Sequence, residues 1–279
     1  MAITNFIPTI WSENLYEELD KKYIAVANCS RDFEGDIKNK GSVVKICGVG
    51  EVTVKNYTKN TDMSDPQLLS DTVRELKIDQ AKYFNFQIDD IDRAQASPKL
   101  MSAAMKIAAS ALANEADKYI YSLYTNAGKT ITAVFSPNQS LVYDFLDAIT
   151  ILRENNVNDP NEIVIEVSPA VAAQLMKEKI NLDLVENGEM LESGCIGRLA
   201  GCKIFISNNV AFTDGGDSVN YHCMIRSKRS IAFAEQLSEI EAYRPEKRFS
   251  DAVKGLHLYG AKVVYPAEVV NLTINVMKP

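Results

Sequence analysis

The chain has few of the residues from which catalytic and metal sites are usually built. Its 279 residues include only two histidines, His222 and His257, together with one tryptophan and five cysteines. His222 and Cys223 are neighbours on an expected strand, so their side chains should point to opposite faces and not share a metal ion. The cysteines are odd in number and scattered, which does not suggest a disulfide framework. We therefore expect no cofactor, no metal site and no enzymatic activity.

Glycine-rich loops that bind phosphate groups are also missing. The Gly128-Lys129-Thr130 triplet lacks the earlier glycine of a phosphate-binding loop, because position 123 is leucine. Gly48-Val49-Gly50 lacks the third glycine of a dinucleotide-binding loop, because position 53 is threonine. No serine lies in a Gly-x-Ser-x-Gly elbow. These absences remove the usual signatures of nucleotide-binding and hydrolytic enzymes.

Positive charge and long apolar runs are scarce as well. The net charge is −7, and the longest uncharged run, residues 130–143, is too short and too polar to span a bilayer. We therefore expect a cytoplasmic protein that makes no membrane contact and does not grip nucleic acid through many phosphates. The single basic cluster, Arg226, Lys228 and Arg229, favours a solvated face or salt bridges between subunits over nucleic-acid contact.

Residues 33–93 form a β-rich stretch that has no obvious partner within the chain. Glycines at 41, 48 and 50 punctuate it, and its expected strands are Ser42–Ile46, Glu51–Tyr57, Thr72–Ile78 and Lys82–Asp89. A two-stranded arm is marginal alone in water and exposes strand edges that proteins normally cover. A neighbouring copy of the same chain would cover these edges, so the stretch predicts a protein that assembles.

Helical patterns lie on both sides of this stretch. Trp11, Leu15 and Leu19 share one helical face, typical of either an exchanged arm or an ordinary first helix. Ser97-Pro98 begins a long alanine-rich helix, because serine is a good N-cap and proline fits the first turn. Asn126 and Gly128 end that helix. We interpret it as a structural spine.

The second half of the chain alternates helices and strands. Helices are expected after Ser136-Pro137 and Ser168-Pro169, with an apolar strand at Ile163–Val167 between them, which indicates an α/β layer. Further strands are expected at Lys203–Ser207, Tyr221–Ile225, Ser230–Ala234, Leu256–Val264 and the regularly alternating 270–276. Residues 213–218 read as a loop.

Several local stretches, taken in order along the whole chain, carry a resemblance to a known family. They are Phe6–Tyr16, Asp32–Gly50, Gly197–Val210 and Phe249–Val270, the last with the run Gly-Leu-His-Leu-Tyr-Gly-Ala-Lys-Val-Val-Tyr-Pro. With the order of arm, β-rich stretch, long helix, α/β layer and final strands, they resemble the HK97-fold major capsid proteins of tailed bacteriophages.

The resemblance implies an α+β fold of the HK97 type, divided into an N-terminal arm, an extended β-loop and two domains. The corresponding residues are 1–30 for the arm, 31–94 for the loop, 95–128 with 235–279 for the peripheral domain and its spine helix, and 129–234 for the α/β axial domain.

The resemblance also implies which residues contact other subunits. On the arm and the loop these are Trp11, Leu15, Val52, Val54, Lys55 and Lys59, and near the capsomer axis Asp214, Gly215, Gly216 and Asp217. Some members of the family join a loop lysine to an asparagine of a neighbour. Lys55 or Lys59 with Asn271 would supply the residue types, but their spacing does not predict that reaction.

The implied function is a structural capsid protein that forms hexamers and pentamers of an icosahedral shell around double-stranded DNA, assembled in the bacterial cytoplasm. A separate scaffolding protein and a portal are expected partners, and DNA is enclosed without sequence-specific binding. Two alternatives stay open. One is an encapsulin-like nanocompartment around a cargo enzyme, and the other is an α/β enzyme that dimerises through its β-arm.

Overall fold

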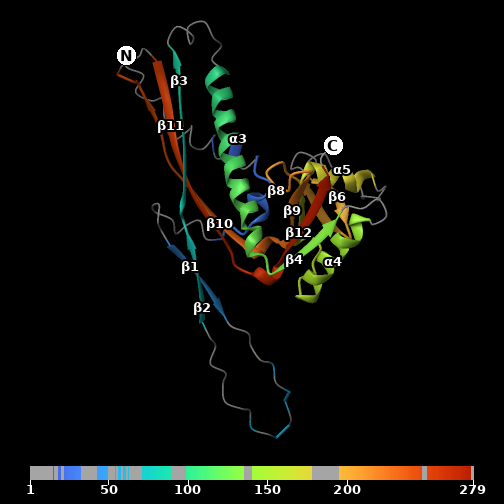
Figure 1. Cartoon of the computed structure of the whole chain (residues 1–279). Helices are drawn as coiled ribbons and strands as arrows, with labels where there is room; N and C mark the ends of the chain where they lie inside the picture. Colours follow the sequence, from blue (N-terminus) through green and yellow to red (C-terminus); the bar gives the residue numbers. More distant parts are fainter. Residues whose placement is uncertain are drawn as a thin grey trace.

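The computed structural model describes residues 15, 18–19, 22–32, 43–49, 54, 56–57, 59–60, 62, 71–89, 99–134, 140–177, 195–246 and 250–277 (Figure 1). The helices are α3 (Lys99–Ser122), α4 (Leu141–Glu154) and α5 (Pro169–Lys177), with short 3₁₀ turns η1 (Val26–Asn28), η3 (Leu123–Asn126), η4 (Lys228–Ser230) and η5 (Pro266–Glu268). The strands are β1 (Val43–Val49), β2 (Asp71–Lys77), β3 (Gln80–Asp89), β4 (Lys129–Val134), β5 (Ile163–Val167), β6 (Cys195–Leu199), β7 (Cys202–Ile206), β8 (Phe212–Asp214), β9 (Ser218–Ser227), β10 (Ile231–Tyr243), β11 (Ser250–Val263) and β12 (Val269–Met277).

A long antiparallel sheet, in the order β10-β11-β3, runs alongside α3 (Figure 1). Residues alternate across its strands, so Phe233 and Tyr259 face α3 and pack with Ala109, Ala113 and other small side chains of the helix. The alanines allow the helix backbone to approach the sheet closely. The expected spine helix is therefore confirmed as α3, although it ends at Ser122 and the 3₁₀ turn η3 takes the place of its expected last turn. Its apolar stripe forms one wall of the first core.

The opposite face of this sheet is covered at one end by the antiparallel pair β1–β2. Val44, Ile46 and Leu76 of the pair are buried against Ala234 and Leu258 of β10 and β11. Gly260 of β11 makes this approach possible, because a Cβ there would lie 2.2 Å from the carbonyl oxygen of Lys77. The β-rich stretch thus has a partner within its own chain, contrary to the expectation that it has nowhere to pack.

The remaining strands form a seven-stranded mixed sheet in the order β4-β12-β9-β5-β7-β6, with β8 beside β9. Helices α4 and α5 pack on the apolar cluster of this sheet through Phe145, Ile149 and Leu175, among others. β5 is buried along its whole length between β7 and β9, and its residues are apolar except for Glu166. The expected α/β layer is present here.

Three short crossings join the layer formed by α3 and the long sheet to the seven-stranded sheet, and they lie close together. They are residues 127–128 after η3, η4 between β9 and β10, and the turn containing η5 between β11 and β12. The Gly128 amide donates to the carbonyl of Pro266 at 2.9 Å, and the Val264 amide donates to the carbonyl of Ser230 at 2.7 Å. Hydrogen bonds thus tie the crossings to one another.

Some expected elements differ in extent from those observed. α4 begins at Leu141, capped by the Ser140 hydroxyl, and not at Ser136-Pro137, whose residues lie outside the described part. Val54, Asn56 and Tyr57, expected within a strand, are not in one. β10 continues beyond Ala234 to Tyr243 because its partner β11 begins as early as Ser250. β4 was not anticipated from the sequence.

Sheet membership bears on the expected division into domains. The expected peripheral domain includes residues 235–279 and therefore β12. In the structure β12 instead pairs with β4 and β9 in the seven-stranded sheet, which otherwise consists of strands from the expected axial part. The η5 turn redirects the chain after β11 and causes this return. The peripheral and axial division stays a prediction, and we take it up again below with β12 on the axial side.

Candidate assembly surfaces and the polar clusters beneath them

The segment between β1 and β2 presents apolar side chains to solvent. Val54 is 92% exposed and Tyr57 is 75% exposed, and Lys59 is also exposed. Val52 and Lys55, two further expected contact residues, lie outside the described residues. The base of this pair is buried, while Val54 and Tyr57 beyond it are exposed, so the pair is an arm anchored on its own subunit with two large exposed side chains.

The expected contact residues of the N-terminal arm divide in two. Trp11 lies outside the described residues. Leu15 is 1% exposed and packs in the core beside α3. Its side chain therefore serves its own subunit and leaves little surface for a neighbour, as in the ordinary-first-helix interpretation.

The expected axis loop is an exposed turn between β8 and β9. The Gly215 amide donates to the Ser218 carbonyl at 2.9 Å, and the Gly216 amide donates to Asp214 Oδ1 at 3.0 Å. Gly216 has a φ of +87°, which glycine adopts without strain, and Asp217 is exposed. The turn at residues 215–217 is confirmed, whereas Thr213, Asp214 and Ser218, also expected in the loop, lie in β8 and β9. The place of this turn in an assembly stays a prediction.

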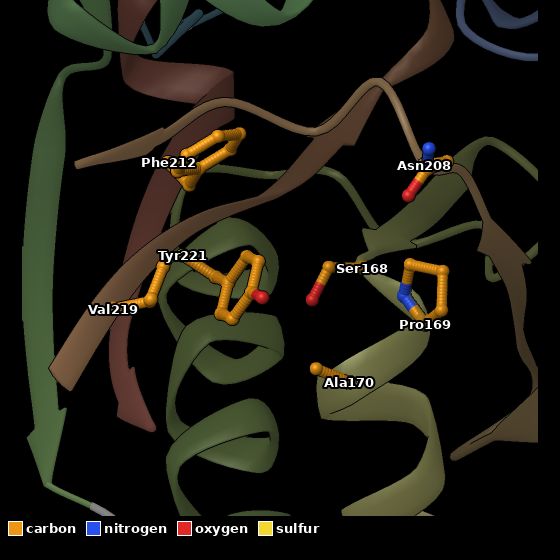
Figure 2. Close-up of a pocket in the computed structure, with 7 residues that line it drawn as sticks. All are labelled: Ser168, Pro169, Ala170, Asn208, Phe212, Val219 and Tyr221. Carbon is orange, nitrogen blue, oxygen red and sulfur yellow. The ribbon is translucent and has the colours of Figure 1, made fainter. Parts of the chain in front are cut away.

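A cleft of about 310 Å³ lies between the end of β5 and the β8–β9 pair (Figure 2). Figure 2 shows Phe212 and Tyr221 on one side and Pro169 and Ala170 on the other. Phe212 is 64% exposed. The lining residues include no carboxylate, histidine, lysine or cysteine, and their side-chain polar groups are the Ser168 and Tyr221 hydroxyls and the Asn208 amide.

Polar side chains instead gather beneath the N-terminal segment. Asp117 of α3 accepts hydrogen bonds of 3.1 Å each from the backbone amides of Ile24, Ala25 and Val26. The carboxylate thereby satisfies amides at the start of η1 that have no partner within the turn. Burial raises the pKa of Asp117 to about 7, although these amides favour its ionised form.

Arg226 of β9 holds the same segment from the other side. Its guanidinium donates to the carbonyls of Asn28 at 2.7 Å and Ala25 at 3.0 Å, and it is paired with Glu166 of β5. Burial raises the pKa of Glu166, while the guanidinium opposes that shift. The expectation of a solvated face or intersubunit salt bridge is therefore wrong for Arg226, because its charge is used inside the subunit.

A group of charged and aromatic side chains connects the base of the β1–β2 pair to the η4 and η5 crossings. Tyr265 lies under the guanidinium groups of Arg74, at 5.9 Å, and Arg229, at 5.6 Å. Arg229 also forms a salt bridge with Glu268 at 2.6 Å. Cation–π contacts of this kind add to the apolar anchoring of the pair.

His222 has a structural setting as well. Its ring stacks on Tyr124 at 4.0 Å, and its nitrogens lie 2.8 Å from the Thr213 hydroxyl and 3.1 Å from that of Thr273. Burial lowers the pKa of His222.

Among the described residues no group of three or more histidine, cysteine, aspartate or glutamate side chains is placed to hold a metal ion. In the same part of the chain no helix is long and apolar enough to cross a membrane.

Asn271, the asparagine considered for a covalent link to a neighbour, is 3% exposed in the middle of β12. It lies between β4 and β9, so its side chain is not available to a lysine of another subunit in this structure.

Comparison with known proteins decides what kind of molecule carries these features. The sequence profile of a family described as "Phage capsid protein" matches residues 72–272, which is most of the chain. The chain belongs to this phage capsid protein family. No curated protein matches it.

Solved structures agree with the family. A chain from Mycobacterium phage Che8 shares 31% identity with this capsid protein, with 90% of each chain covered and a TM-score of 0.68. The capsid of Ralstonia phage GP4 is 11% identical, covering 94% of this chain and 91% of that one, with a TM-score of 0.72. A virus-like particle from Pyrococcus furiosus is 12% identical, covering 93% and 96%, with a TM-score of 0.56.

The last two similarities show the fold alone. Together the comparisons confirm the HK97-like α+β fold and a structural major capsid protein that forms a shell.

Proposed function

We propose that this capsid protein forms hexamers and pentamers that close into an icosahedral shell around double-stranded DNA. The observation that carries the proposal is the β1–β2 arm, whose base is buried on its own subunit while Val54 is 92% exposed. Covering the exposed Val54 and Tyr57 side chains with a neighbouring subunit removes apolar surface from water and so stabilises the contact. Contacts that repeat from one subunit to the next generate closed rings when the rotation permits.

In this proposal Val52, Val54, Lys55 and Lys59 of the arm, and Trp11 of the N-terminal region, contact neighbouring subunits. The turn formed by Asp214, Gly215, Gly216 and Asp217 lies near the capsomer axis. The peripheral part comprises α3 with the β10-β11-β3 sheet, and the axial part comprises the seven-stranded sheet, including β12.

The acidic balance of the chain supports enclosure of DNA without tight binding. A net charge of −7 is unfavourable for extensive phosphate contact, so packaged DNA remains free to leave the shell. A separate scaffolding protein and a portal complete the proposal, with assembly in the bacterial cytoplasm and no enzymatic activity in the capsid protein itself.

The test combines imaging with one substitution. The full chain, expressed with its scaffolding partner, should give closed particles in negative-stain images and light scattering. Val54→Asp should leave the subunit folded, because the side chain is almost fully exposed, and should reduce particle yield. Tyr143→Asp on α4, where the side chain is 67% exposed, is the matched control away from the arm.

Equal loss of particles in both variants would remove the support for the arm as a contact. Particles from infected cells should contain nuclease-protected DNA. If they contain a protein cargo and no DNA, the DNA part of the proposal is wrong and the nanocompartment alternative gains.

A further inference from the structure

Residues 22–32, here called the N-terminal strap, cover the last part of the expected N-terminal arm (1–30) and precede the β1–β2 pair in the chain. The strap contacts both α3 and the long sheet. Asp117 holds its η1 turn to α3, and Ser30 pairs with Ala232 of β10. The Ser30 amide donates to Ile231 at 2.9 Å, and the Phe233 amide donates back to Ser30 at 2.9 Å.

Glu235 of β10 is the second carboxylate that holds the strap. Tyr23 donates its hydroxyl to Glu235 Oε2 at 2.5 Å, and Arg31 forms a salt bridge with Oε1. From the sheet side, His257 Nε2 lies 2.8 Å from Oε2. The side chain of Glu235 is 2% exposed, so one buried carboxylate connects two strap residues to β11.

His257 is buried beside Glu235 and contacts its carboxylate. It is 0% exposed, and its second ring nitrogen, Nδ1, has no hydrogen-bond partner among the described residues. A buried polar atom without a partner is costly, so the ring is held in this position despite that cost. In this position the ring contacts Glu235 through Nε2.

Glu235 also lies beside an irregularity of the long hairpin. The β10–β11 register shifts between Leu237 and Glu239, only two residues beyond Glu235. Such a bulge leaves one residue unpaired and bends the strand that contains it. From this point β10 continues to Tyr243, away from the crossings.

Removal of the strap would leave Glu235 without its cation and without the Tyr23 hydroxyl. A buried charge that loses its partner is strongly destabilising, whereas a carboxylate that reaches water is not. Glu235 reaches water if the strands around its bulge also open.

We infer that Glu235 is a latch that couples the N-terminal strap to the outer half of the β10–β11 hairpin, so that the two segments open together. The consequence for the shell rests on the proposed function. A change in the N-terminal strap of one subunit would be transmitted to the end of its long sheet. The coupling itself is a property of the single chain.

Hydrogen exchange of the purified full-length chain tests the inference. Peptides covering 22–32 report on the strap, those covering 236–258 report on the hairpin, and those covering 141–154 in α4 report on global unfolding. In Glu235→Gln the strap and hairpin peptides should both exchange about 10- to 100-fold faster, while the α4 peptides stay protected. Tyr23→Phe, which removes only one hydroxyl, should produce a smaller change in the same two segments.

Glu241→Gln is the matched control. It makes the same chemical change on the same strand, but Glu241 is exposed and pairs with Lys254 at 2.7 Å on the surface. Its exchange should equal that of the wild-type chain. If Glu235→Gln unfolds the whole chain, the comparison is made with Tyr23→Phe alone.

Acceleration of only the strap, only the hairpin, or neither segment would overturn the coupling. These outcomes are independent of particle formation, so normal shells with uncoupled segments would reject the latch and leave the proposed function standing. Failure of the wild-type chain to form particles with its scaffolding partner would reject the proposed function and leave the latch untouched.

Discussion

Arg226 and Glu166 form a buried bidentate ion pair. Nε of Arg226 lies 3.0 Å from Oε2, Nη2 lies 2.9 Å from Oε1, and both side chains are 0% exposed. The remaining guanidinium donor capacity is directed at the strap carbonyls. Because every charged atom has a partner, the pair is tolerated in a place where a single charge would not be.

Arg226→Met should therefore destabilise the subunit by about 3–5 kcal/mol, because it leaves Glu166 buried and uncompensated. The shift in urea midpoint measures the loss. Lys254→Met, which breaks the exposed pair with Glu241, should cost less than about 1 kcal/mol. The double variant Glu166→Leu with Arg226→Met should recover part of the loss, and equal stability of the double and single variants would contradict this account.

We expect the free energy of unfolding to depend on pH through Asp117, because burial raises the pKa of this residue. Its pKa is raised from 3.8 to about 7 in the folded chain, so the folded state binds this proton more tightly than the unfolded state. The stabilisation is full below about pH 4 and is lost as pH rises to about 7, by at most about 1.4 kcal/mol per pH unit for one proton. Unfolding free energies between pH 5 and 8 should show this decline.

Asp117→Asn is the necessary comparison. Burial lowers the pKa of His222, whose titration acts in the opposite direction over an overlapping range, so the wild-type profile contains both. Only the difference between the two profiles isolates Asp117. A difference that does not vary with pH would show that the carboxyl group does not titrate in this range.

Gly260→Ala should displace the β1–β2 pair from the sheet. A Cβ at this position would lie 2.2 Å from the Lys77 carbonyl oxygen, and backbone cannot yield as a flexible side chain does. Overpacking of this kind should cost about 1–3 kcal/mol in urea unfolding. Lys262→Ala, on the same strand with an exposed side chain, should stay within about 0.5 kcal/mol of the wild type. Wild-type stability of the glycine variant would contradict the close approach.

Local patterns in the sequence predicted the long helix, the buried strand β5 and the alternating last strand. Each depends on neighbours within a few residues, such as the alanine stripe of α3 or the alternation of Leu272 and Ile274 with polar residues. The glycine turn at 215–216 was predictable for the same reason. The resemblance to capsid proteins came from the order of these parts.

Long-range partners were not predictable in this way. Arg226 and Glu166 are 60 residues apart, and Arg226 looked like part of a surface cluster because Lys228 and Arg229 follow it closely. β4 is short and polar at alternate positions, and it becomes a strand because β12 returns to pair with it in parallel. Asp117 gave no sequence signal, since a single aspartate in a helix is normally solvated.

The three adjacent crossings have a mechanical consequence for a subunit that is pulled by its neighbours in a shell. A tension that pulls the seven-stranded sheet away from α3 and the long sheet is divided among three covalent backbones, one from α3 at 127–128 and two from the long sheet at 228–230 and 264–268. The hydrogen bonds that tie these segments together, such as Val264 to Ser230, distribute the load among them. A single linker would bear the whole force alone, whereas this triple junction shares the force among three segments and so resists extension.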